Sequence, residues 1–81
     1  MNDDRCVHAE FGDEKIVRYN RAGKWYVEFD PANLRSARHI SIKYAARRAL
    51  ELQALGGTIH FRLPGGGAFD RWVGRFGGTP E

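Results

Sequence analysis

The chain has 81 residues, with 13 Lys and Arg against 10 Asp and Glu, a formal net charge of +3, 42% hydrophobic residues and a single cysteine. This length allows one small domain and leaves little volume for a roomy internal active site. A single cysteine excludes an intramolecular disulfide and a cysteine-based zinc site, so packing alone must hold the fold.

Charge is unevenly distributed along the chain. Residues 1–14 have a net charge of −4, which leaves +7 on residues 15–81 given the overall +3. A body this basic favours an acidic partner or a polyanion. No apolar run reaches the ~18 residues of a membrane span, and the acidic start is unlike a signal peptide. We therefore expect a cytoplasmic protein with no membrane partner.

Three strands are expected in the first third of the chain. Residues 7–11 alternate apolar and polar side chains, which indicates an additional N-terminal strand. Residues 16–19 and 25–29 are rich in β-branched and aromatic side chains, and the loop between them contains glycine, which predicts a β-hairpin. The period of two places Trp25, Val27 and Phe29 on the core face of this hairpin.

A helix follows a basic connector. Ser41 is a good N-cap, Gly56 is a good C′ residue, and residues 42–55 between them show helical periodicity. A start at Ser36 is also compatible with the pattern. One broad stripe of this helix is apolar and should pack on the sheet, and its members are Ile42, Ala45, Ala46, Ala49, Leu50 and Leu52.

A second hairpin is expected after the helix. Residues 58–63 alternate, with Ile59, Phe61 and Leu63 inward, residues 64–68 form a flexible turn, and residues 69–73 return as a strand. The predicted fold class is therefore α+β: a small antiparallel sheet of two hairpins, with one helix packed on one face. The domain layout would be an acidic segment at 1–14, the α+β domain at 15–76 and a disordered tail at 77–81.

Three runs of residues carry a resemblance to a known group of domains. They are residues 23–27 (GKWYV), the helix pattern at 45–52 and the strand at 56–61 before a glycine-rich turn. They resemble a family of small uncharacterised bacterial and phage domains, over about residues 15–73. The resemblance implies a tryptophan-bearing hairpin, an alanine-rich helix and a second short hairpin, and it implies no functional residue. A more distant likeness, to recombinase arm-binding domains, suggests DNA binding at the level of fold alone.

Sites of chemistry are hard to find in this sequence. The histidines His8, His39 and His60 lack metal-site spacing and are expected at the surface. Cys6 lies in an acidic terminus that disfavours a thiolate. The Gly65–Gly67 run is interpreted as a hairpin turn, because a strand rather than a helix is predicted after it. We therefore expect no catalytic residue, no metal and no cofactor, and hence no enzyme.

What remains are surfaces for binding. One is the sheet face opposite the helix, where Arg18, Tyr26, Glu28, His60 and Arg62 should be exposed. The other is a basic set along the connector and helix, in which Arg47 and Glu51 are spaced as an ion pair. Nucleic-acid binding is the first hypothesis, and a protein-interaction module or small regulator of a partner, with a homodimer left open, is the alternative. The candidate nucleic-acid contacts are Arg18, Arg35, Arg38, Lys43, Arg47, Arg48 and Arg62, and the candidate protein-interface residues are Tyr26, His60 and Trp72.

Overall fold

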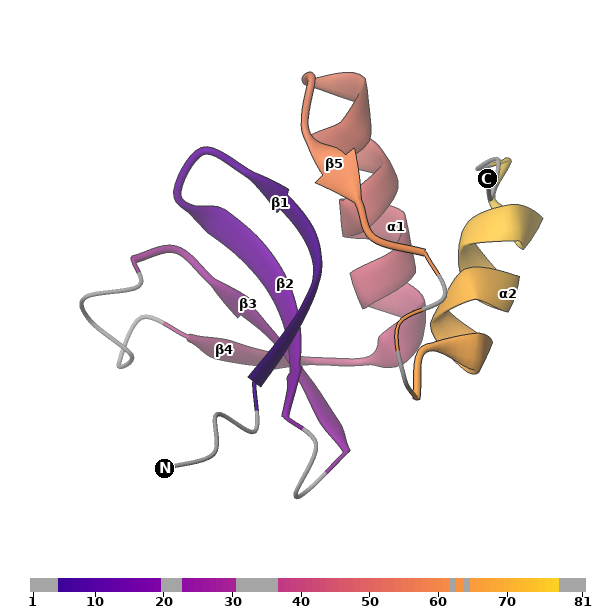
Figure 1. The fold of residues 1–81 in the computed structure, drawn as a ribbon, viewed down its shortest axis with the longest axis horizontal. Coiled ribbons are helices and arrows are strands. Elements are labelled where there is room, and N and C mark those ends of the chain that lie inside the picture. Colours follow the sequence, from indigo (N-terminus) through magenta and orange to yellow (C-terminus); the bar gives the residue numbers. More distant parts are fainter. Residues whose placement is uncertain (1–4, 20–22, 31–36, 62, 64, 78–81) are drawn as a thin grey trace.

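The chain forms a five-stranded antiparallel sheet with two helices on one side of it, as Figure 1 shows for the computed structural model. The structure describes residues 5–19, 23–30, 37–61, 63 and 65–77. The expected α+β fold class with an antiparallel sheet is confirmed.

The sheet is built around the first three strands of the chain. Its spatial order is β4-β3-β2-β1-β5, so β4 and β5 form its two edges. The expected N-terminal strand and the expected hairpin are both present, as β1 and as β2 with β3. The strands are β1 (Arg5–Phe11), β2 (Glu14–Tyr19), β3 (Lys24–Glu28), β4 (Arg38–Ile40) and β5 (Thr58–Ile59).

The predicted helix is α1 (Ile42–Ala54). The Ser41 side chain accepts a hydrogen bond of 3.1 Å from the backbone N–H of Tyr44, which confirms the N-cap. Gly56 has φ +106°, a conformation that favours glycine, as expected beyond the end of a helix. The predicted apolar stripe is buried or packs against the core. The alternative start at Ser36 is wrong, because β4 lies immediately before the cap.

The predicted second hairpin is wrong. β5 has only two residues and pairs with β1, and residues 67–75 form a second helix, α2 (Gly67–Arg75). Phe69, Trp72, Val73 and Phe76 follow one another at steps of three, one and three residues, which places them on one side of a helix and not of a strand. Phe69 and Val73 are fully buried against the core, and Trp72 and Phe76 pack at its margin.

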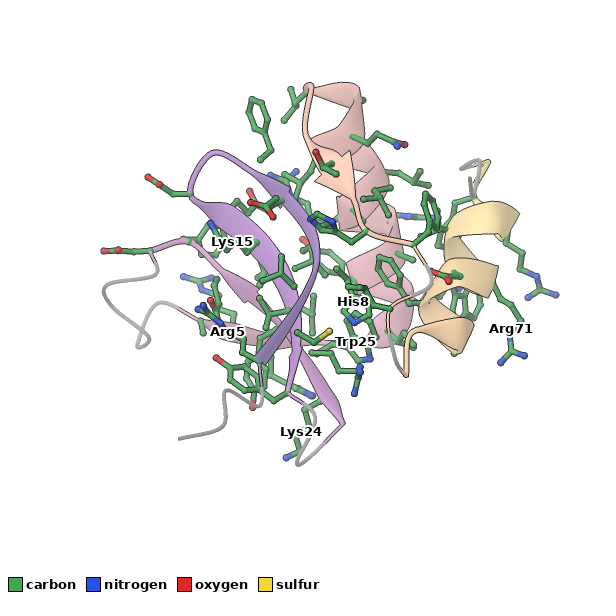
Figure 2. All side chains as sticks on the ribbon, in the orientation of Figure 1. Arg5, His8, Lys15, Lys24, Trp25 and Arg71 are labelled. Carbon is green, nitrogen blue, oxygen red and sulfur yellow. The ribbon has the colours of Figure 1, made fainter. Side chains whose placement is uncertain are left out.

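The core lies between the sheet and the two helices. In Figure 2, Trp25 and His8 lie in this space. The Trp25 ring stacks on the Phe69 ring, with centroids 5.0 Å apart and planes 11° apart, and so joins β3 to α2. Trp25 and Val27 face inward as predicted, whereas Phe29 lies beyond β3 and is 44% exposed, so its predicted place in the core is wrong.

The predicted domain boundaries remain predictions, although β1 joins the acidic first segment to the same sheet as the rest. The proposed disordered tail is mostly outside the described residues, which end at Gly77.

Candidate functional site

Arg18 is not on the exposed sheet face where the sequence placed it. It lies directly opposite Trp25 in the pairing of β2 with β3, and opposed residues of an antiparallel pair point to the same side. Its side chain is therefore on the helix side of the sheet, and the residue is only 9% exposed. The prediction of an exposed Arg18 is wrong because its strand partner is Trp25, which faces the helices.

The opposite sheet face forms a cluster of its own polar groups. Glu28, expected to be exposed, is 1% exposed and accepts hydrogen bonds from the Tyr19 hydroxyl at 2.6 Å and from the Arg5 guanidinium at 3.0 Å. The Tyr26 ring packs edge-on against the rings of Tyr19 and His39, at centroid distances of 5.2 and 5.4 Å. Glu28 thus partly neutralises the charge of Arg5 on this face.

The remaining candidate binding residues do not lie together at one place in the fold. His60 lies 3.0 Å from a carboxylate oxygen of Glu10. Tyr26 is on the far face of the sheet and Trp72 is on α2, so the predicted interface residues do not come together with His60. Arg38 is exposed on the edge strand β4, beside a groove of about 440 Å³ that also includes Phe29 and Tyr44 among its lining residues. Arg35 and Arg62 lie outside the described residues.

Arg48 connects α1 to the β1–β2 hairpin. Its Nε and Nη2 donate to the two carboxylate oxygens of Glu14 at 2.6 and 2.7 Å, and its Nη1 donates to Glu51 at 2.6 Å. These hydrogen bonds, that to Glu14 first, raise the pKa of Arg48 further above its ordinary value. The expected pair of Arg47 with Glu51 is replaced by the pair with Arg48. Two carboxylates neutralise Arg48, so it is a poor phosphate contact.

Lys43 and Arg47 are different, because both project from the exposed side of α1 toward aromatic rings of α2. The Lys43 ammonium lies 5.2 Å from the centre of the Trp72 ring, and the Arg47 guanidinium lies 5.2 Å from the centre of the Phe76 ring. Both distances are within the range of cation–π attraction. A shallow groove of about 220 Å³ is lined by Ser41, Lys43, Tyr44 and Arg47.

Two further cations on α2 were missed by sequence reasoning. Arg71 and Arg75 are both exposed and are separated by one helical turn, and together with Ala68 and Trp72 they line a groove of about 320 Å³. Arg71 projects from α2 away from the sheet in Figure 2. The Arg75 guanidinium lies 5.4 Å from the centre of the Trp72 ring. Their spacing of four residues was the available signal, hidden by the assignment of this segment to a strand.

We call the resulting surface the basic helical face. Within the part of the chain that the structure describes, none of its four cations forms a salt bridge with a carboxylate. The rings of Trp72 and Phe76, which stack on each other at a centroid distance of 5.6 Å, lie among these charges. Such a surface attracts anions and offers aromatic contacts to flat groups. Its members are Lys43, Arg47, Arg71, Trp72, Arg75 and Phe76.

His8 is completely buried, so its expected surface position is wrong. A bulge in the pairing of β1 with β2 lies between Val7 and Ala9 and turns the intervening side chain toward the core. The ring lies 4.6 Å from that of Trp25 and 5.2 Å from that of Phe69, measured between centroids. Burial, with the nearby charge of Arg18, lowers the pKa of His8 to about 4, so the ring is neutral at pH 7.

The described residues contain no group of three or more His, Cys, Asp or Glu side chains placed to hold a metal ion. Cys6 is a free, half-buried thiol. No helix among the described residues is long and apolar enough to cross a membrane.

Comparison with known protein families, with curated proteins and with solved structures finds no match to this chain. The resemblance to small bacterial and phage domains therefore stays a prediction.

Proposed function

We propose that this protein binds nucleic acid through the basic helical face. The observation that carries the proposal is a set of four cations that form no salt bridge with any carboxylate of the described residues and that lie on two adjacent helices around two aromatic rings. Cations that lack internal partners keep their full charge for a ligand, and phosphate contacts dominate the affinity of proteins for nucleic acids.

The arrangement of these side chains suits a chain of phosphates. Each helix contributes two cations one turn apart, Lys43 with Arg47 and Arg71 with Arg75, so charge extends along both helices. Arginine pairs with phosphate oxygens through its planar fork of donors. Trp72 supplies a ring on which a base can stack once a phosphate attracts the cations beside it. Binding of this kind fits the cytoplasmic location that the sequence led us to expect.

Fluorescence anisotropy with labelled single-stranded and duplex DNA tests the proposal. Binding should weaken with salt, with a log–log slope of about −3 to −4 if all four cations contact phosphates. The variant with both Arg47→Gln and Arg71→Gln should bind at least about tenfold more weakly at about 50 mM salt and lose about two units of slope.

A matched control changes the same amount of charge elsewhere. Lys15 and Lys24 lie on strands β2 and β3, away from α2 in Figure 2, and their replacement by Gln should leave affinity unchanged within about twofold. Equal losses in the two double variants would show a diffuse charge effect and contradict the proposed surface. No binding at all at about 50 mM salt would refute nucleic-acid binding and favour an acidic protein as the partner of the same face.

A further inference from the structure

The turn before α2 brings together three groups from distant parts of the chain. Gly66 is the N-cap of α2, and Gly65 precedes it with φ +74°. A Cβ atom on Gly65 would lie 2.5 Å from Nη2 of Arg18, and a Cβ atom on Gly66 would lie 2.8 Å from Cε1 of His8. The positive φ favours glycine at position 65, and the close contact with the buried His8 ring favours it at position 66. The backbone of this turn therefore lies directly against a guanidinium from β2 and an imidazole from β1.

The first N–H groups of α2 have no acceptor within the helix. The first intrahelical bond runs from the N–H of Asp70 to the carbonyl of Gly66, so the N–H groups of Gly67, Ala68 and Phe69 have no acceptor within the helix. The N-cap, a glycine, provides no side-chain capping bond. These donors and the helix dipole favour a negative charge at this end of α2.

His8 provides an independent sign of a missing polar group. The ring is completely buried, and neither of its nitrogens has a hydrogen-bond partner among the described residues. Buried polar groups in folded proteins are almost always paired, so a ring with two unused nitrogens needs an explanation. Its Nδ1 would lie 3.3 Å from a Cβ atom on Gly66, which aims this edge of the ring at the N-cap of α2.

We propose that the N-terminus of α2, with Arg18 and His8 beneath the Gly65–Gly66 turn, binds a phosphate group. Arg18 supplies the positive charge, and the N–H groups of Gly67 and Ala68 supply directed donors. The His8 ring packs against the turn at Gly66 from the core side. This site adds a specific phosphate contact to the proposed function, and it rests on that function only for the source of the phosphate. The source is either the nucleic-acid backbone or a free phosphate. Asp70, in the same helical turn, is the opposing charge and should keep the affinity modest.

The site adjoins the basic helical face. Ala68, in the first turn of α2, lines the same groove as Arg71, Trp72 and Arg75. A phosphate held at the N-terminus of α2 would thus be the end of a row of cations, and a nucleic-acid strand on the groove would place its phosphates along that row.

The experiment is a titration of the ¹⁵N-labelled protein with inorganic phosphate, followed by amide chemical shifts at constant ionic strength and pH 7. The amides of Gly65, Gly67 and Ala68 should shift and saturate with a Kd of about 1 to 10 mM, the weak affinity of a single small anion. Chloride at the same ionic strength should leave them unmoved.

Two glycine substitutions make the test specific. A Cβ atom at Gly67 or at Gly74 would meet nothing within 4 Å, so Gly67→Asp and Gly74→Asp should both fold, which thermal melts would verify. Gly67→Asp places a carboxylate at the helix N-terminus, where it should raise the Kd for phosphate at least about tenfold. Gly74→Asp makes the same charge change near the other end of α2, and it should change the Kd by less than about twofold.

The outcomes separate this site from the proposed function. Absent or diffuse phosphate shifts, or equal losses in the two aspartate variants, would overturn the site even if DNA binding holds. Loss of both phosphate and DNA affinity in Gly67→Asp would support the site and identify the nucleic-acid backbone as the source. Loss of phosphate affinity in Gly67→Asp, with DNA affinity unchanged or with no DNA binding by the wild-type protein either, would support the site with a free phosphate as its ligand.

Discussion

Replacing His8 with leucine should remove a large part of the acid sensitivity of this fold. In the folded protein the His8 pKa is lowered from 6.5 to about 4, first by burial and then by the charges of Arg18 and His60. In the unfolded chain the ring takes up a proton near pH 6.5. The unfolded state therefore binds more protons than the folded state between these two values, and stability must fall as the pH falls through this window.

The size of the effect follows from the shift. A lowering of the pKa from 6.5 to about 4 corresponds to about 3 kcal/mol of the free energy of unfolding. This contribution is fully present above pH 6.5 and is lost as the pH falls to about 4. A domain of 81 residues has a total stability of only about 4 to 12 kcal/mol. Protonation of one buried ring should thus remove a quarter or more of the free energy of unfolding.

Urea unfolding at pH 7, 6, 5 and 4, followed by circular dichroism, measures this contribution. The other ionisable groups are the same in both proteins, so the informative quantity is the difference in unfolding free energy between His8→Leu and wild type. That difference should change by about 3 kcal/mol in favour of the variant as the pH falls from 7 to 4. Parallel curves for the two proteins would refute the buried, neutral state of His8.

Two further substitutions test the packing. Trp25→Ala removes the ring that stacks on Phe69, so it should lower the free energy of unfolding by about 3 to 5 kcal/mol, and Trp25→Phe should lower it by less. A melting temperature little changed by Trp25→Ala would mean that the core face of β3 is misassigned. Gly57→Ala should destabilise the fold by more than about 2 kcal/mol, because its Cβ atom would collide with the backbone carbonyl oxygens of Glu10 and Leu52. The Cβ atom of Gly67→Ala would meet open space, so this variant should be tolerated, and equal melting temperatures for the two variants would contradict the close contact of residue 57 with β1.

The elements that sequence reasoning predicted are those whose signal is local. Helix α1 has a capping serine, a long apolar period and a terminal glycine, all within sixteen consecutive residues. The hairpin of β2 and β3 has dense β-branched and aromatic residues around a short loop. Such patterns depend on neighbours in the chain, so one sequence is enough to read them.

Helix α2 was missed although its pattern was present. Phe69 and Val73 are four residues apart and Phe76 follows three later, a helical spacing that outweighs the short alternation seen in the segment. The preceding glycines favoured a hairpin turn, and that assignment hid Arg71 and Arg75 as surface cations. The weak turn signal of these glycines thus led both to the wrong secondary structure for residues 69–73 and to the omission of two candidate binding residues.

Other features depend on contacts between distant residues and were beyond one sequence. The bulge that buries His8 exists only in the pairing of β1 with β2. The inward direction of Arg18 depends on which residue of β3 lies opposite it. The pairing of Arg48 with Glu14 joins positions 34 residues apart, so nothing local distinguished Arg48 from its neighbour Arg47, which lies over the Phe76 ring instead.

The shape of the sheet also limits how copies of this protein can join. Its outer strands have three and two residues, and Arg38 and His39 on β4 are exposed. Short edge strands, and charge on an edge such as that of Arg38 on β4, are a recognised protection against the addition of foreign strands, because few backbone groups are left to pair and like charges on two copies repel each other. A dimer joined edge to edge at β4 would gain very few backbone hydrogen bonds. Growth into fibrils by strand addition is disfavoured for the same reason, so a concentrated solution of the folded protein should remain clear.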